Sequence, residues 1–124
     1  PGEPRQGYEY SRTTNPTRTV LERCLADLES APHGLCFASG LAAIACLLQR
    51  LESGARIVAG NDLYGGTHRL FMKCFGRFGL RFDFVDTSDL SQVERALKAG
   101  PSAYLYLETP TNPLLKLSDI AACS

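Results

Sequence analysis

Apolar side chains recur along the chain with two different periods, which predict two kinds of secondary structure. Spacing of three to four residues, typical of amphipathic helices, predicts helices over residues 16–30, 41–51, 67–78, 89–99 and 117–123. Short apolar or alternating runs predict buried strands near Leu35, Ile57, Phe82 and Leu105. Because strands and helices alternate with short connections, we expect an α/β layer fold with a mostly parallel sheet.

Asparagine, proline and glycine mark the ends of the predicted elements. Asn15 and Pro16 are typical of a helix start, since the asparagine side chain accepts free backbone N–H groups and proline has none to satisfy. Gly79 is expected to end a later helix. The first fifteen residues show no periodicity, so we expect an extended arm over residues 1–15 and an incomplete α/β domain over residues 16–124.

Three polar segments follow predicted strands and are candidates for a ligand site. They are Ser39-Gly40, Tyr64-Gly65-Gly66-Thr67 and Glu108-Thr109-Pro110-Thr111-Asn112-Pro113. In parallel sheets, ligands bind where the carboxyl ends of the strands meet. We therefore expect Ser39, Tyr64 and Asn112 to lie on the same edge of the sheet.

Ser39 and Gly40 stand where a strand is expected to turn into a helix. Free N–H groups and the positive end of the helix dipole favour an anion such as phosphate there, and Gly40 lets a ligand approach the backbone closely. The alternative is a simple N-cap by Ser39, and the two residues by themselves favour that alternative.

Tyr64 and Asn112 also have a functional and a structural interpretation. The glycines after Tyr64 leave room for its ring to stack on a flat heteroaromatic molecule; otherwise it is a surface side chain beside a turn. Pro110 and Pro113 fix the backbone around Asn112, so its amide is either a rigidly held binding group or a cap for the turn.

Tyr10 and Arg12 lie two residues apart in the expected arm. A guanidinium offers a planar fork of donors to phosphate or carboxylate, and a tyrosine hydroxyl can donate to the same oxygens. The alternative is an exposed arm that binds no ligand.

Four short motifs occur in order along the chain: Tyr10-Ser11-Arg12-Thr13-Thr14-Asn15-Pro16-Thr17, Ser39-Gly40-Leu41-Ala42-Ala43, Tyr64-Gly65-Gly66-Thr67 and Glu108-Thr109-Pro110-Thr111-Asn112-Pro113. Together they resemble the Cys/Met-metabolism family of pyridoxal-phosphate enzymes, which includes cystathionine γ-lyase, cystathionine γ-synthase and cystathionine β-lyase. The resemblance runs from about Gly7 to the end of the chain. It implies pyridoxal 5'-phosphate (PLP) as the cofactor and a three-layer α/β fold, part of the large domain of type I PLP-dependent transferases.

The resemblance implies a role for each residue of the candidate site. In similar enzymes the counterparts of Gly40 and Leu41, beside Ser39, donate backbone N–H groups to the cofactor phosphate. The counterpart of Tyr64 stacks on the pyridine ring and takes part in proton transfer, so Tyr64 is the expected catalytic residue of this chain. The counterpart of Asn112 lies near the ring and its 3′-oxygen.

Contacts with another subunit and with the substrate are implied as well. Tyr10 and Arg12 match an arm that crosses to the neighbouring subunit and binds the PLP phosphate there, so we expect a homotetramer built as a dimer of dimers. Arg12, Tyr64 and Arg69 match positions near the sulfur amino-acid substrate. These oligomer and substrate contacts follow from the resemblance alone.

Two residues that this family needs have no match in the chain. In relatives, the lysine that forms a Schiff base with PLP and the aspartate that pairs with the pyridine nitrogen follow the loop at residues 108–113. Lys73, Lys98 and Lys116 lack the expected context. We therefore expect a fragment of a longer protein that is inactive by itself.

For the parent protein, the resemblance implies elimination or replacement at the γ or β carbon of cystathionine-type substrates, as in trans-sulfuration. One alternative is a catalytically silent α/β ligand-binding module. The other is a Rossmann unit that binds a nucleotide or S-adenosylmethionine, but residues 37–41 lack the G-x-G-x-x-G spacing that such a unit needs.

Composition excludes several other classes of function. With 13 basic and 13 acidic residues among 124, binding to nucleic acid or to an anionic membrane has no electrostatic support. The longest apolar run, residues 41–48, is too short to span a bilayer. Two distant histidines predict no metal site, and five cysteines without a C-x-x-C pair predict buried, reduced thiols in a cytoplasmic protein.

Overall fold

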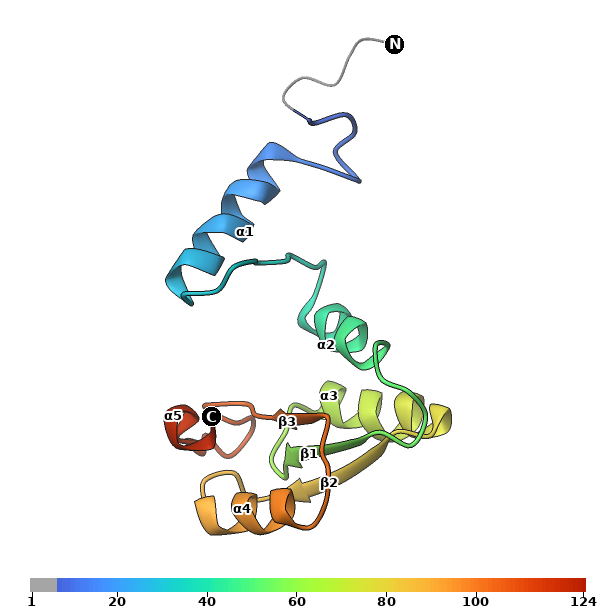
Figure 1. Cartoon of the computed structure of the whole chain (residues 1–124), viewed down its shortest axis with the longest axis vertical. Coiled ribbons are helices and arrows are strands. Elements are labelled where there is room, and N and C mark those ends of the chain that lie inside the picture. Colours follow the sequence, from blue (N-terminus) through green and yellow to red (C-terminus); the bar gives the residue numbers. More distant parts are fainter. Residues whose placement is uncertain (1–6) are drawn as a thin grey trace. The chain divides into compact units, whose positions relative to one another are not determined.

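The computed structural model describes residues 7–124 and divides the chain into two compact units, with the division between Ala43 and Ile44. Figure 1 shows the elements of both units in chain order. The division falls inside the segment that the sequence predicts to be one α/β domain. Each unit is described separately below.

The first unit contains helix α1 (Pro16–Leu28), which confirms the helix predicted from residue 16. Asn15 has an extended backbone, and its side-chain oxygen accepts the N–H groups of Thr17 at 2.9 Å and Arg18 at 3.2 Å. The helix therefore begins as the sequence predicts, with an asparagine cap followed by a proline that has no N–H to satisfy.

The strand predicted near Leu35 is wrong, because residues 31–38 form no strand. The side chain of Leu35 is 76% exposed, and the N–H of Cys36 donates to the Glu22 carboxylate at 3.0 Å rather than to a neighbouring strand. A Cβ on Gly34 would lie 2.2 Å from the carbonyl oxygen of Glu22. The segment thus packs its backbone directly against α1, and no strand in the described residues pairs with it.

The second unit is built around a parallel sheet of three strands, β1 (Arg56–Gly60), β2 (Arg81–Val85) and β3 (Tyr104–Tyr106), in the order β2-β1-β3. These strands confirm three of the four predicted ones. Ile57, Val58 and Ala59 of the central strand are fully buried, as expected for a strand covered on both faces.

Helices cover both faces of this sheet, as Figure 1 shows for α3 and α4. The other helices of this unit are α3 (Gly65–Arg69), α4 (Leu90–Lys98) and α5 (Ile120–Cys123), while α2 (Gly40–Leu48) contains the division between the two units. Asp89 caps α4 by accepting the N–H of Ser91 at 2.9 Å. Helix, sheet and helix give three layers, so the predicted fold class is confirmed.

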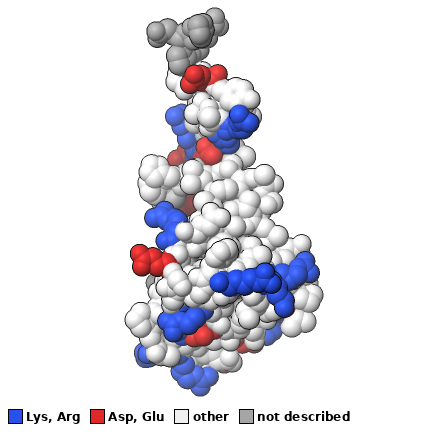
Figure 2. Space-filling model, turned by 90° about the vertical axis from the view of Figure 1, so that its right-hand side faces the viewer, with Lys and Arg blue, Asp and Glu red and all other residues white. Residues whose placement is uncertain are grey.

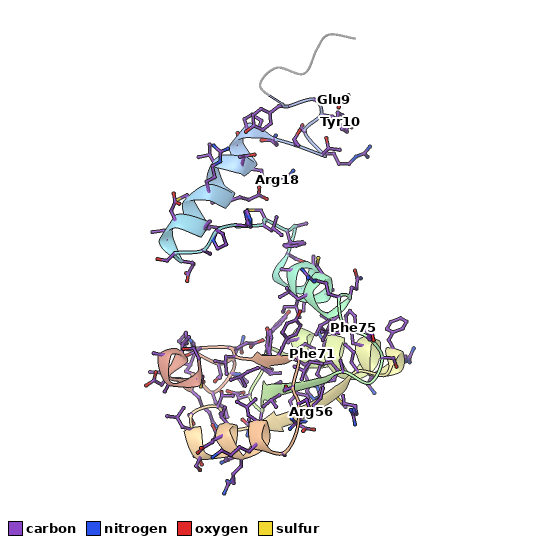
Figure 3. The ribbon with its side chains drawn as sticks, in the orientation of Figure 1. Glu9, Tyr10, Arg18, Arg56, Phe71 and Phe75 are labelled. Carbon is purple, nitrogen blue, oxygen red and sulfur yellow. The ribbon has the colours of Figure 1, made fainter. Side chains whose placement is uncertain are left out.

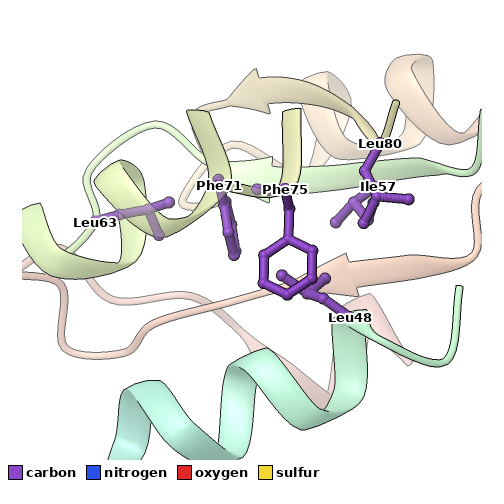
Figure 4. Packing of buried hydrophobic residues seen from close by; sticks show 7 residues of the cluster. Leu48, Ile57, Leu63, Phe71, Phe75 and Leu80 are labelled. Carbon is purple, nitrogen blue, oxygen red and sulfur yellow. The ribbon is translucent and has the colours of Figure 1, made fainter. Parts of the chain in front are cut away.

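One hydrophobic cluster fills the space between the sheet and the layer containing α3. Its buried members are Leu48, Ile57, Ala59, Leu63, Phe71, Phe75 and Leu80, and Figure 4 shows how they face one another. The fully buried ring of Phe71 stacks on Phe82, with centroids 4.5 Å apart, and meets the edge of Tyr106 at 5.2 Å. Burying a side chain of this size contributes roughly 1.5–3 kcal/mol to stability.

The helix predicted over residues 67–78 is present but irregular. After α3 the chain forms a π-helical turn, η1 (Leu70–Cys74), and then a 3-10 turn, η2 (Phe75–Phe78). Gly79 ends it, as predicted, with a left-handed φ of 86°. The positive φ favours glycine here, and a Cβ at this position would in addition force the Ser53 hydroxyl to rotate.

The prediction of buried thiols is wrong for most of the cysteines. All five are free, and Cys24, Cys46 and Cys74 are exposed while the other two are half-buried. Each of the three exposed cysteines lies on a helical surface that no described residue covers. Helical periodicity therefore predicted the helices correctly, but it wrongly predicted that these three cysteines lie on their buried faces.

Candidate active site

The loops that follow β1 and β3 are joined at the carboxyl edge of the sheet by the side chain of Glu108. One carboxylate oxygen accepts the backbone N–H of Tyr64 at 2.7 Å. The other accepts the hydroxyl groups of Thr67 at 2.9 Å and Tyr106 at 3.2 Å. Since β1 and β3 are adjacent and parallel, this carboxylate connects the start of α3 to the loop at residues 108–113.

A second carboxylate, Asp62, fixes the same loop from the β1 side. It accepts hydrogen bonds from the hydroxyl of Thr111 and from the N–H of Leu114, the latter at 3.0 Å. Asp62 and Thr111 are 9% and 3% exposed, so the connection between the two loops is buried. The turn after Asn112 is therefore capped by Asp62.

Asn112 lies on this rigidly held loop with its side chain exposed. Its amide makes no hydrogen bond to the described residues. The alternative that Asn112 caps the turn is therefore not supported by any hydrogen bond. The peptide bonds before Pro110 and Pro113 are both cis. An amide that is free on a fixed backbone is available to a ligand.

Polar contacts also join the segment after this loop to the end of β2. The Lys116 ammonium lies 2.6 Å from the carboxylate of Asp86, and the Ser118 hydroxyl donates to the Thr87 hydroxyl oxygen at 2.8 Å. Ser118 and Thr87 are both buried. The segments that follow all three strands are thus connected at the carboxyl edge.

Burial raises the pKa of Tyr106 to about 12, and the negative charge of Glu108 acts in the same direction. The Tyr106 hydroxyl therefore keeps its proton over the whole physiological range and remains a donor to Glu108. The Tyr106–Glu108 contact is therefore a hydrogen bond in which the phenol does not change its protonation near pH 7.

The hydrogen bond from Lys116, together with those from Ser88, lowers the pKa of Asp86 from 3.8 to about 2. A carboxylate with a lowered pKa stabilises the folded state above its unfolded pKa and loses that contribution as the pH falls through the folded value. Asp86→Asn is therefore expected to lower the melting temperature at neutral pH, and the difference should shrink as the pH falls from about 4 through about 2. Melting curves of the two proteins from neutral pH down to about pH 2 check this, and a gap at about pH 2 as large as the one at neutral pH would contradict it.

Tyr64 and Arg69 stand at the two ends of α3. The Tyr64 side chain is 49% exposed, and its ring lies against the backbone of Gly66, which has no side chain in the way. Arg69 is exposed and forms no ion pair with the described residues. The phenol and the guanidinium are therefore both accessible to a ligand.

The start of α2 has the donors that an anion needs. The Ser39 hydroxyl oxygen accepts the N–H of Ala42 at 3.1 Å, so Ser39 caps the helix as its structural interpretation expects. The N–H groups of Gly40 and Leu41 remain free of acceptors among the described residues. Capping and anion binding are compatible here, and this donor set fits a phosphate group.

Tyr10 and Arg12 lie in a turn just before α1 (Figure 3 labels Tyr10). The Tyr10 carbonyl accepts the N–H groups of Thr13 at 3.0 Å and Thr14 at 2.9 Å. The Arg12 guanidinium stands 5.2 Å from the centre of the Tyr10 ring, and both side chains are exposed. The two donors are thus held together on the surface of the first unit.

The structure brings together the Tyr64 and Asn112 parts of the predicted site through Glu108 and Asp62. Ser39, Gly40 and Leu41, together with Tyr10 and Arg12, belong to the first unit. Sequence reasoning missed Asp62, although an acidic residue directly after a strand and its turn is a recognisable signal for such a contact.

Three further features of the part of the chain that the structure describes, residues 7–124, concern surface charge, metal ligands and membrane spans. Figure 2 shows basic and acidic side chains together on one face. Within residues 7–124, no three or more His, Cys, Asp or Glu side chains are grouped to hold a metal ion. No helix of that same range has the length and apolar character needed to cross a membrane.

The chain is similar to several proteins of known name. It is 54% identical over 116 residues to a probable cystathionine gamma-synthase of Herpetosiphon aurantiacus, covering 94% of this chain and 36% of that protein. It is 50% identical to cystathionine beta-lyase of Coxiella burnetii, covering 94% of this chain and 30% of the relative. The chain thus spans about a third of the length of the relatives it matches.

A solved structure agrees with these similarities. The crystal structure of cystathionine gamma-lyase from Lactobacillus plantarum, complexed with L-serine, matches with a TM-score of 0.81 and 50% identity over 93% of this chain and 30% of that one. The Rossmann and silent-module alternatives are not favoured by any of these matches. The family model described as Cys/Met metabolism PLP-dependent enzyme matches residues 1–124, and the chain therefore belongs to that family of PLP-dependent enzymes.

Proposed function

We propose that this chain is the N-terminal part of a longer enzyme that eliminates or replaces a group at the γ or β carbon of cystathionine-type substrates. The relatives carry the names of a synthase and of lyases, and the chain spans 36% and 30% of two of them. The remaining length of the relatives has room for the lysine and the aspartate that the family requires. The substrate is a small sulfur amino acid.

The observation that carries this proposal is the hydrogen-bonded carboxyl edge of the sheet. Glu108 and Asp62 hold the start of α3 and the loop of Asn112 in place. Two side chains that have no structural task in the described residues, the Tyr64 ring and the Asn112 amide, remain accessible on this frame. An aromatic ring and an amide on rigid supports are suited to orienting a flat cofactor.

The bound cofactor supplies the electron sink that stabilises negative charge at the substrate α-carbon. Tyr64 would stack on the cofactor ring, and its hydroxyl oxygen would take part in proton transfer. Asn112 would offer its amide near the ring and its 3′-oxygen. Ser39, Gly40 and Leu41 hold the phosphate through the start of α2.

The arm and the assembly are part of the same proposal. Tyr10 and Arg12 bind the cofactor phosphate of a neighbouring subunit, within a dimer of dimers in the cytoplasm. Arg12 and Arg69 provide positive charge near the substrate, together with Tyr64. The cation–π pair at 5.2 Å supports a joint role for the two arm residues, since it holds both donors on one turn.

The three lysines of this chain are each ion-paired or exposed among the described residues. Lys98 lies 2.5 Å from Glu94 on the exposed surface of α4, and Lys116 lies 2.6 Å from Asp86. Lys73 is exposed on η1. We therefore assign the covalent chemistry to a lysine outside this chain.

The function is tested with the purified full-length protein and the isolated 124-residue chain. The full-length protein is expected to show a visible absorbance band of bound PLP that borohydride abolishes, and to release keto acid and thiol from a cystathionine-type substrate. The isolated chain is expected to bind PLP weakly and to release no more product than free PLP does. Keto acid formed without an added thiol indicates elimination, and a substituted product formed only with the thiol indicates replacement.

Two results would contradict the proposal. A full-length protein without bound PLP would support the silent module instead. Turnover by the isolated chain would mean that Lys73, Lys98 or Lys116 carries the chemistry.

A further inference from the structure

The ring of Tyr64 occupies the volume that a side chain at position 66 would take. A Cβ built on Gly66 would lie 2.3 Å from Cε1 of Tyr64, 3.0 Å from Cδ1 and 3.1 Å from Cζ. Carbon atoms that are not bonded to each other do not approach to 2.3 Å, because their optimal separation is about 3.5–4.0 Å. The neighbouring Gly65 differs, since a Cβ there would meet no described atom within 4 Å.

The backbone of Tyr64 is fixed independently of its ring. Its N–H donates to Glu108 at 2.7 Å, and Thr67, three residues later and 1% exposed, donates to the same carboxylate at 2.9 Å. A methyl group on Gly66 therefore has to be accommodated by rotation of the Tyr64 side chain rather than by movement of the start of α3.

Such a rotation affects the orientation of the ring far more than the stability of the fold. The Tyr64 side chain is already 49% exposed, so turning it away removes less buried apolar area than moving a fully buried ring would. Alanine also has a higher helix propensity than glycine, which offsets part of the loss. The absence of a side chain at Gly66 therefore mainly affects the orientation of the Tyr64 ring.

We propose that Gly66 is a positioning residue, which acts by leaving the space that fixes the Tyr64 ring in the orientation needed to stack on a flat cofactor. The stacking part of this inference rests on the proposed function, whereas the ring orientation does not. Gly65 has no such task, although it lies beside Gly66 in the same helical turn.

The test compares Gly66→Ala with Gly65→Ala in the full-length protein. With fluorotyrosine incorporated, the resonance of Tyr64, assigned by Tyr64→Phe, is expected to shift in cofactor-free Gly66→Ala and to stay in place in Gly65→Ala. The dissociation constant for PLP is expected to rise about two- to tenfold in Gly66→Ala only, the range that loss of one aromatic stacking contact gives. The melting temperatures of both variants should stay close to that of the parent.

A double substitution separates positioning from a folding defect. In a Tyr64→Ala background, adding Gly66→Ala is expected to weaken PLP binding no further, because no ring is left to displace. A weakening that persists in that background, or an unshifted Tyr64 resonance in Gly66→Ala, would overturn the inference. If the parent protein binds no PLP, the proposed function fails, while the resonance shift still decides whether Gly66 positions the ring.

Discussion

Arg56→Ala is expected to lower the free energy of unfolding by about 3 kcal/mol, because one side chain connects three elements of the second unit. The Arg56 guanidinium lies 2.6 Å from the Asp83 carboxylate on β2, and it donates to the carbonyl oxygens of Ala96 at 2.7 Å and Gly100 at 3.0 Å. Its side chain is only 13% exposed. Figure 3 labels Arg56 in the second unit. Truncation removes the Arg56 donor from one carbonyl in the last turn of α4 and from one just after the helix, although Ala96 still accepts the N–H of Ala99 at 3.2 Å.

Arg81 provides a matched control, since it pairs with Arg56 in the register of β1 and β2. Its guanidinium is exposed and donates only to the Gly54 carbonyl, so Arg81→Ala is expected to lower stability by about 1 kcal/mol or less. Denaturant unfolding of the cofactor-free full-length protein measures the loss of stability in each variant. Hydrogen exchange of the β1 amides gives the local measurement. Equal losses for the two variants would show that the three contacts of Arg56 contribute little.

Local patterns predicted most of the elements of this fold but not all of their details. Asn15 with Pro16, Asp89 and Gly79 each carry their own capping chemistry, so the ends of α1, α4 and η2 follow from short segments. The run around Leu35 is as apolar as a strand but forms none, because a strand needs a partner and the described residues offer it only α1. Apolar runs of this length do not reveal whether such a partner exists.

In the candidate site, too, some features could be predicted from the sequence and others could not. Tyr64 and Asn112 could be identified as candidates because they follow predicted strands and stand beside glycines or prolines. Their support could not be predicted, since Glu108 and Tyr64 are 44 residues apart in the sequence and Asp62 and Thr111 are 49 apart. Contacts of this kind depend on the order of the strands, which composition and periodicity do not determine.

Glu108→Ala is expected to have the other large effect, a loss of about 3 kcal/mol in the free energy of unfolding. The substitution removes the acceptor of three donors, namely the Tyr64 N–H and the hydroxyl groups of Thr67 and Tyr106. The Thr67 side chain is 1% exposed, so water cannot replace the carboxylate there. A buried donor left without a partner costs about 1–3 kcal/mol.

Two further variants show whether the loss comes from these hydrogen bonds. Glu108→Gln keeps one oxygen for the Tyr64 N–H, and its amide can donate to the hydroxyl oxygens, so it should recover a large part of the stability. Glu94→Ala removes an exposed carboxylate paired with Lys98 and should leave stability almost unchanged. Hydrogen exchange at the Tyr64 amide gives the local measurement, and it should accelerate in Glu108→Ala while remaining slow in Glu108→Gln. Unchanged exchange in Glu108→Ala would mean that the start of α3 is held by other contacts, and that the carboxyl edge does not depend on this carboxylate.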